Sequence, residues 1–301
     1  MASEHMDRRT FYMIMLLVVT FFWGVTFPVI KEALVYISPD AFLAFRFLIA
    51  TGIMAALARK GGALAHKKTI VTGLAAGFLL FLGYYFQTVG LEYTSAAASG
   101  IITGIYVVIL PLISFVYLRQ KVSRMDLAAS VMAFSGLIVM SAASGVGTGS
   151  RLGDALTLIC GVAYAVQIAY VSKHSKNLDS FGFTFYQILG VTIFSFIAIP
   201  ISPGGVGTIN AYVIFAMVFT AVFGSIFAYY ISTIALIYVE PTAAGIIYVG
   251  EPVFAALSAV VISHEVLGVP LIVGGTIMVA AMLLTSVDKY LQRKRMKAYQ
   301  S

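Results

Sequence analysis

Charged residues are scarce in this chain of 301 residues, because Asp, Glu, Lys and Arg together make up only 10% of it. Soluble domains carry about 25% charged residues, so this scarcity and the 60% hydrophobic content exclude an ordinary soluble domain. We therefore expect a protein that crosses a membrane several times. Cysteine is also nearly absent, and the single Cys160 cannot form a disulfide within the chain.

The sequence lacks the motifs of the common enzyme classes as well. It contains no HExxH and no GxSxG, and no second acidic residue lies in the middle of an apolar run to pair with Glu251. No His, Cys, Asp or Glu residues cluster at the spacing of metal ligands, so we expect no catalytic residue, no metal and no cofactor. The net charge of +7 is spread over short loops, which argues against nucleic-acid binding.

What the sequence does have is a series of ten apolar runs, most of them long enough to cross a bilayer as a helix. We expect the first to be a span and not a cleaved signal peptide, because it is long enough to cross by itself. We expect residues 1–5 of the opening MASEHM to be a vector scar, with Met6 as the native start. The expected spans are residues 11–30, 41–58, 69–89, 95–118, 126–143, 154–172, 181–201, 210–236, 242–263 and 267–287.

The distribution of basic residues predicts the orientation. With the N-terminus inside, sixteen of the nineteen Lys and Arg residues face the cytoplasm, Lys31 and Arg151 lie outside, and Arg46 lies within the second span. Cytoplasmic loops of membrane proteins carry such an excess of positive charge. We expect a multi-pass protein of the cytoplasmic (inner) membrane with both termini in the cytoplasm.

An internal repeat divides the chain into halves. The string YTSAAASGII at 93–102 resembles YVEPTAAGII at 238–247, an offset of 145, and Gly-Val at 24 and at 161 lie 137 apart. Because each half holds five spans, an odd number, the second copy must be inverted relative to the first. The expected parts are an N-terminal tail (1–10), a first five-helix repeat (11–143), a linker (144–153), a second five-helix repeat (154–287) and a basic cytoplasmic tail (288–301).

Glu251 lies midway along the ninth run, close to the centre of a bilayer at about 1.5 Å per helical residue. Insertion scales give about 2.5–3.5 kcal/mol for a centred Asp, Lys or Arg, so a charge there faces a wet cavity or a partner. The alternative is a carboxylate that only pairs with a neighbouring helix.

Proline predicts where the helices bend. We expect helix breaks at Pro28, Pro111 and Pro252, because proline removes a helical hydrogen bond. At the offset of 145, Glu251 corresponds to Tyr106, whereas Pro111 lies one turn beyond the position that corresponds to Pro252. This difference predicts breaks at different depths in the two halves.

Several aromatic and polar residues could line a cavity beside Glu251. Residues three or four apart share a helix face, and aromatic rings and amides in mid-run need partners in the interior. Helix packing is the alternative for most of them, and Arg46 could either extend outward or turn towards a carboxylate such as Glu251. The expected substrate-binding residues are Trp23, Phe27, Arg46, Tyr85, Tyr106, Tyr164, Gln167, Tyr229, Tyr248 and Glu251.

Long stretches of the chain resemble the drug/metabolite transporter superfamily, EamA type. They are FFWGVTFPVIKEAL from residue 21, AFRFLIA from 44, LEYTSAAASGIITGIYVVILPL from 91, and ALIYVEPTAAGIIYVGEPVFAAL from 235, with HEVL following at 264–267. The resemblance implies an all-α membrane protein of ten transmembrane helices, arranged as two inverted five-helix repeats. It also implies a central cavity formed mainly by the first, third, fourth, sixth, eighth and ninth spans, and export or exchange of small metabolites.

Together these features predict a secondary transporter that moves an amino acid or similar zwitterion by alternating access. We expect membrane lipids and a small-molecule substrate as partners, proton coupling through Glu251, and a monomer or weak homodimer. A broad drug or organic cation exporter, a non-transporting scaffold or sensor, and a membrane enzyme are the alternatives.

Overall fold

The computed structural model describes residues 7–58, 66–141, 150–199, 205–263, 268–270 and 272–284. These residues are almost entirely helical, as the apolar runs predict. The N-terminal residues 1–6, the HEVL string and the basic tail lie outside the described residues. Residues 144–149 of the expected linker also lie outside them, and its last residues already belong to a helix that begins at Arg151.

Of the described segments that are long enough to cross a membrane, six are continuous helices and three are interrupted. The continuous helices are α1 (Arg8–Ala33), α2 (Pro39–Ala58), α3 (Lys67–Tyr93), α6 (Arg124–Ser141), α7 (Arg151–His174) and α8 (Ser180–Ala198). The interrupted segments are α4 (Ala96–Thr103) with α5 (Tyr106–Val116), α9 (Ala211–Phe219) with the π-helix η2 (Thr220–Phe227) and α10 (Ala228–Tyr238), and α11 (Pro241–Tyr248) with α12 (Gly250–Ser263).

Within the described residues, nine segments are long and apolar enough to cross a membrane. They match the first nine expected spans, with ends that differ by a few residues. A shorter apolar helix, Ile272–Leu284, lies in the tenth expected span, whose remaining residues are outside the description. The total of ten therefore stays a prediction.

Short polar side chains define where several helices begin. Ser95 accepts a hydrogen bond from the backbone N–H of Ala98 at the start of α4, and Asp179 accepts one from Gly182 at the start of α8. Such caps satisfy amide groups that have no partner within the helix.

The interruptions of the fourth and ninth spans lie at equivalent places. The fourth span breaks at Gly104 and Ile105, and the ninth breaks at Val249, 145 residues after Gly104. The eight-residue helices α4 and α11, which precede the breaks, are related by the same offset. The expectation of breaks at different depths is therefore wrong, because the chain turns before both prolines.

The three prolines themselves lie within helices. Pro28 lies inside the continuous α1, Pro111 inside α5, and Pro252 in the first turn of α12, where no helical N–H is required. Pro28 has no N–H to donate to the carbonyl of Gly24, and the Ser258 hydroxyl lies 3.4 Å from that carbonyl and 2.9 Å from the carbonyl of Ala255. A side chain of the second half thus lies within reach of the carbonyl that Pro28 leaves without its helical partner.

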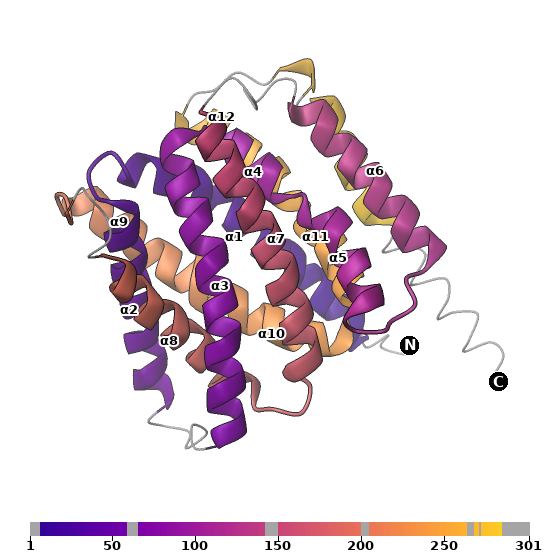
Figure 1. Ribbon diagram of the computed structural model, residues 1–301. Helices are drawn as coiled ribbons and strands as arrows, with labels where there is room; N and C mark the ends of the chain where they lie inside the picture. The colour runs from indigo at the N-terminus through magenta and orange to yellow at the C-terminus, as the bar shows by residue number, and fades with distance from the viewer. Residues whose placement is uncertain are drawn as a thin grey trace, which may run out of the picture.

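The helices pack into one bundle with α6 at one end and α2, α8 and α9 towards the other (Figure 1). In it, α3 packs along both α7 and α8, and α1 packs along α12 and α10. The backbones of α3 and α8 nearly touch, since a Cβ atom on Gly77 would lie 2.4 Å from the carbonyl oxygen of Gln187. Helices from the two halves of the sequence therefore alternate through the core.

Candidate functional site

A cavity lies in the centre of the bundle where both halves meet. It is lined from α1, α3, α5, α7, α10, α11 and α12, which belong to the six spans that the family resemblance implied. The empty space between the lining side chains amounts to about 430 Å³, which includes open solvent at the mouth. The lining residues are Trp23, Thr26, Tyr84, Gln87, Tyr106, Tyr164, Gln167, Ile168, Tyr229, Tyr248 and Glu251.

Glu251 gives the cavity its charged group. Within the part of the chain that the structure describes, Glu251 is the only lining residue with a formal charge. It lies in the first turn of α12, directly after the helix interruption, and is 7% exposed. The hydroxyl of Tyr106 donates a long hydrogen bond of 3.5 Å to Oε2 of Glu251. One weak donor leaves most of the carboxylate free to meet a ligand.

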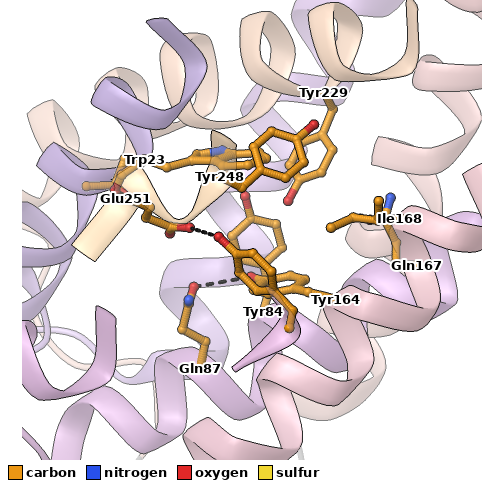
Figure 2. A pocket seen from close by; sticks show the side chains of 11 residues that line it. Trp23, Tyr84, Gln87, Tyr164, Gln167, Ile168, Tyr229, Tyr248 and Glu251 are labelled. Carbon is orange, nitrogen blue, oxygen red and sulfur yellow. Dashed lines mark hydrogen bonds between the residues drawn. The ribbon is translucent and has the colours of Figure 1, made fainter. Parts of the chain in front are cut away.

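Amide groups form a second polar region of the cavity. The Tyr164 hydroxyl donates to Oε1 of Gln87 at 3.1 Å, and Nε2 of Gln87 donates to the Thr103 hydroxyl at 3.3 Å. Gln167, about one turn after Tyr164 on α7, adds a second amide to the lining (Figure 2). These neutral groups can both donate and accept, so they can orient a polar ligand.

Six aromatic rings make up most of the wall. The Trp23 ring lies 5.1 Å from that of Tyr248 and 5.5 Å from that of Tyr229, measured between centroids. The Tyr84 ring lies 5.8 Å from Tyr164 and 6.0 Å from Tyr229. Contacts of this kind hold the rings in place, and their faces attract cations. A carboxylate among aromatic rings is chemically suited to an ammonium group that carries an apolar body.

Seven of the ten expected substrate-binding residues line this cavity, which makes them candidates and does not test binding. Three others lie elsewhere. Phe27 packs in an apolar cluster between α1, α2 and α9, nearer the C-terminal end of α1 than Trp23. The half-buried Tyr85 lies beside Phe81 and Phe86, on another face of α3.

Arg46 is fully buried behind the cavity wall. Its guanidinium group donates to the hydroxyls of Ser225 and Tyr84, and no carboxylate of the described residues forms an ion pair with it. It therefore neither extends outward nor turns to Glu251. Its partners come from distant parts of the chain, so helical periodicity could not identify them.

Four lining residues were missed in the sequence, namely Thr26, Tyr84, Gln87 and Ile168. The positions of the glycines along α3 could have favoured Tyr84 over Tyr85 as a lining residue. Gly73, Gly77 and Gly83 all lie on the buried face of α3, and Tyr84 and Gln87 continue that face. Tyr84 also precedes the selected Tyr229 by 145 residues, the offset of the repeat. Thr26 and Ile168 carry no comparable signal.

The described residues hold no group of three His, Cys, Asp or Glu side chains close enough to bind a metal ion. The polar chemistry of the cavity thus comes from one carboxylate, two amides, phenol hydroxyls, an indole N–H and a threonine hydroxyl.

Comparison with known proteins identifies the family to which this chain is similar. The model of the EamA-like transporter family matches residues 10–142 and 151–287. A protein of Archaeoglobus fulgidus named "Uncharacterized transporter" is 32% identical over 285 residues, which are 93% of this chain and 87% of the relative. The "Uncharacterized transporter YvbV" of Bacillus subtilis is 29% identical over 178 residues, 58% of each chain.

A solved structure described as "Crystal structure of protein" has the same fold. It superposes with a TM-score of 0.76 at 17% identity, and the alignment covers 92% of this chain and 97% of the other. The likeness concerns the arrangement of the helices alone.

Proposed function

This chain belongs to the EamA-like transporter family, and on that premise we propose that it is a secondary carrier for a small metabolite with an ammonium group. The substrate class that we favour is an amino acid or similar zwitterion, exported or exchanged across the cytoplasmic membrane by alternating access. The observation that carries this proposal is Glu251, a carboxylate inside an aromatic cavity at the centre of the bundle. Membrane interiors bury such a group where a ligand or ion compensates it.

The proposed site assigns a role to each kind of lining residue. Glu251 would pair with the ammonium group of the substrate, and the rings of Trp23, Tyr106 and Tyr248 would surround the apolar part of the substrate. Since Arg46 does not line the cavity, a substrate carboxylate would be bound by neutral donors, chiefly Tyr164 and the amides of Gln87 and Gln167. Phe27 and Tyr85 would support the wall from outside.

The proposed topology is ten spans in two inverted repeats. In three pairs, the two residues occupy equivalent positions of the repeat and contact each other. Equivalent residues of a two-fold symmetric structure can contact each other only close to the symmetry axis. The pairs are Tyr106 with Glu251, Tyr84 with Tyr229, and Thr51 with Thr192, whose hydroxyls lie 2.8 Å apart. The first two pairs are 145 residues apart, and the third is 141 apart, which is the offset between Pro39 and Ser180 at the starts of α2 and α8. The excess of basic residues on one side supports cytoplasmic termini.

A difference between the halves supports alternating access. Gly24 of α1 packs against Phe254 and Ala255 of α12, whereas its equivalent Gly161 of α7 packs against Thr103 and Ile105. At the offset of 145, the latter pair corresponds to residues 248 and 250, more than one helical turn before residues 254 and 255. The two halves therefore use different packing registers. Exchange of the two registers would expose a central site to the opposite side of the membrane.

An organic cation exporter is the second candidate. It is favoured by the aromatic rings and by the lack of a basic side chain among the lining residues that the structure describes. A substrate carboxylate would then be unnecessary.

A matched pair of ligands distinguishes the zwitterion carrier from the organic cation exporter. A thermal-shift screen of metabolites on the purified protein selects the amino acid that stabilises it most. Proteoliposomes loaded with that amino acid then take up the labelled form by counterflow, in competition with the amine that lacks only the carboxyl group. A zwitterion carrier is inhibited much more weakly by the amine than by the amino acid, and equal inhibition favours the cation exporter. Binding without counterflow would indicate a scaffold or sensor, and chemical change of the label would indicate an enzyme.

A further inference from the structure

Arg46 carries a positive charge in the interior of the bundle with no exposed surface. A charge in such a place must be compensated, because membrane and protein interiors solvate it poorly. Its Nε donates to the Ser225 hydroxyl at 3.1 Å, and its Nη2 donates to the Tyr84 hydroxyl at 3.2 Å. The guanidinium carbon also lies 4.7 Å from the ring centroid of Tyr84 and 5.1 Å from that of Phe47. Hydroxyls and ring faces, and no carboxylate, hold it in the described part of the chain.

Both hydroxyl partners of Arg46 connect it to the π-helix η2. Ser225 belongs to η2, and its hydroxyl donates to the carbonyl of Thr220 at 3.1 Å, five residues back as in the helix itself. Helices of this type are rare and frequently lie at functional sites. The Tyr84 hydroxyl, which accepts from Arg46, donates in turn to the carbonyl of Gly224 at 3.2 Å. Arg46 is thus joined to two successive residues of η2.

The same carbonyl holds a second wall residue. Nε1 of Trp23 donates to the oxygen of Gly224 at 3.0 Å, so one backbone oxygen fixes two of the six aromatic rings of the cavity. Residue 224 has little room for a side chain, since a Cβ atom there would lie 3.0 Å from Nη2 of Arg46 and 3.0 Å from the Thr26 methyl group.

From this geometry we infer that Arg46 is a positioning residue for the cavity, which acts on Trp23 and Tyr84 through the π-helix. Arg46 holds Ser225 and Tyr84, the π-helix presents the Gly224 carbonyl, and that carbonyl sets the two rings that contact a substrate. The substrate role rests on the proposed function, whereas the placement of the rings does not.

Arginine suits this task better than lysine. A planar guanidinium group donates in two fixed directions and stacks on a ring, whereas an ammonium group is a compact, strongly hydrated point charge. Arg46→Lys is therefore expected to keep the charge and lose the link between Ser225 and Tyr84.

The chain contains one tryptophan, so Trp23 reports on the network by fluorescence without labelling. The experiment compares emission maximum and acrylamide quenching of the purified, ligand-free protein with those of Arg46→Lys and Ser225→Ala. Thr51→Val is the matched control, because Thr51 lies on the same helix and its hydroxyl bonds to Thr192, outside the network. We expect both network variants to shift the emission and to raise the quenching constant of Trp23. The control should leave both unchanged.

The two network variants should also be non-additive, since each removes the bond between Arg46 and Ser225. Ser225→Ala keeps the buried charge, so it tests the network even where Arg46→Lys does not fold. Unchanged Trp23 emission and quenching in a folded Ser225→Ala protein would overturn the inference. Because this measurement uses no ligand, its outcome is independent of whether the protein transports anything.

Discussion

The hydroxyl of Tyr106 lies 3.5 Å from Oε2 of Glu251, and these two residues occupy the same position of the internal repeat, 145 residues apart. Each follows the interruption of its own span, at the start of α5 and α12. In the inverted repeat that we propose, a residue that contacts its own equivalent lies beside the two-fold axis. The point where the halves differ most in chemistry, phenol against carboxylate, is therefore also the point where they meet.

Glu251→Gln should weaken ligand binding strongly. An interaction with a charged partner contributes about 1.5–3 kcal/mol, which corresponds to a loss of affinity of about 10- to 100-fold. Tyr106→Phe is the comparison, and it should cost less than Glu251→Gln because the hydrogen bond it removes is long. Titration of the best stabiliser by thermal shift measures both. Wild-type affinity in Glu251→Gln would reduce the residue to a role in packing.

Gly83→Ala should disturb the cavity through Tyr164. A Cβ atom at residue 83 would lie 2.3 Å from Cε1 of Tyr164, so the ring must move and its bond to Gln87 should break. We expect a loss of about 1–3 kcal/mol in the free energy of unfolding, as for other overpacked cores, together with weaker ligand binding.

Gly52→Ala is the control for this change, because nothing lies within 4 Å of the added atom. It should leave ligand binding unchanged and stabilise α2 by up to about 1 kcal/mol. Equal thermal stability and equal affinity of the two variants would contradict the placement of Tyr164.

The ion pair of Arg9 and Glu240 should contribute little to stability. It joins the start of α1 to the residue before α11, but the Glu240 side chain is 47% exposed. Exposed pairs contribute about 0–1 kcal/mol, and salt screens them. Thermal unfolding of Arg9→Ala, Glu240→Ala and the double variant at low and high salt measures the coupling. A coupling above this range that does not decrease with salt would show that the pair is effectively buried.

A pH gradient tests proton coupling separately from transport. If Glu251 exchanges a proton for substrate, an imposed gradient should change uptake into proteoliposomes, and Glu251→Gln should remove that dependence. Uptake that ignores the gradient in the wild-type protein would restrict Glu251 to substrate binding.

Much of this structure could be predicted from the sequence because the bilayer constrains it. Apolar runs gave the spans, and the strings around Glu251 gave the family, which the comparisons confirm. The helix interruptions were less accessible. Proline indicated a break, but the chain turns earlier, at Gly104 and Val249, and the Gly24 carbonyl left by Pro28 finds a hydroxyl in the other half. Partners that are distant in sequence decide such details.

Contacts between distant residues limited the prediction of the site in the same way. Glu251 and Tyr248 are three residues apart and could be selected from helical spacing, although the chain turns at Val249 between them. Tyr84 and Tyr85 are neighbours that only the packing of α3 separates. Arg46 has the residue type of a ligand-binding group, yet its hydrogen bonds to Ser225 and Tyr84 depend on a π-helix that no sequence pattern indicated.

The most direct measurement is counterflow in proteoliposomes that contain either the wild-type protein or Glu251→Gln. Vesicles are loaded with the amino acid that stabilises the protein most, and uptake of its labelled form is followed from outside. A carrier with its site at Glu251 should accumulate label transiently in the wild-type vesicles and only at the background rate in the variant vesicles. Equal accumulation in both, or none in wild-type vesicles with a ligand that binds, would contradict the account.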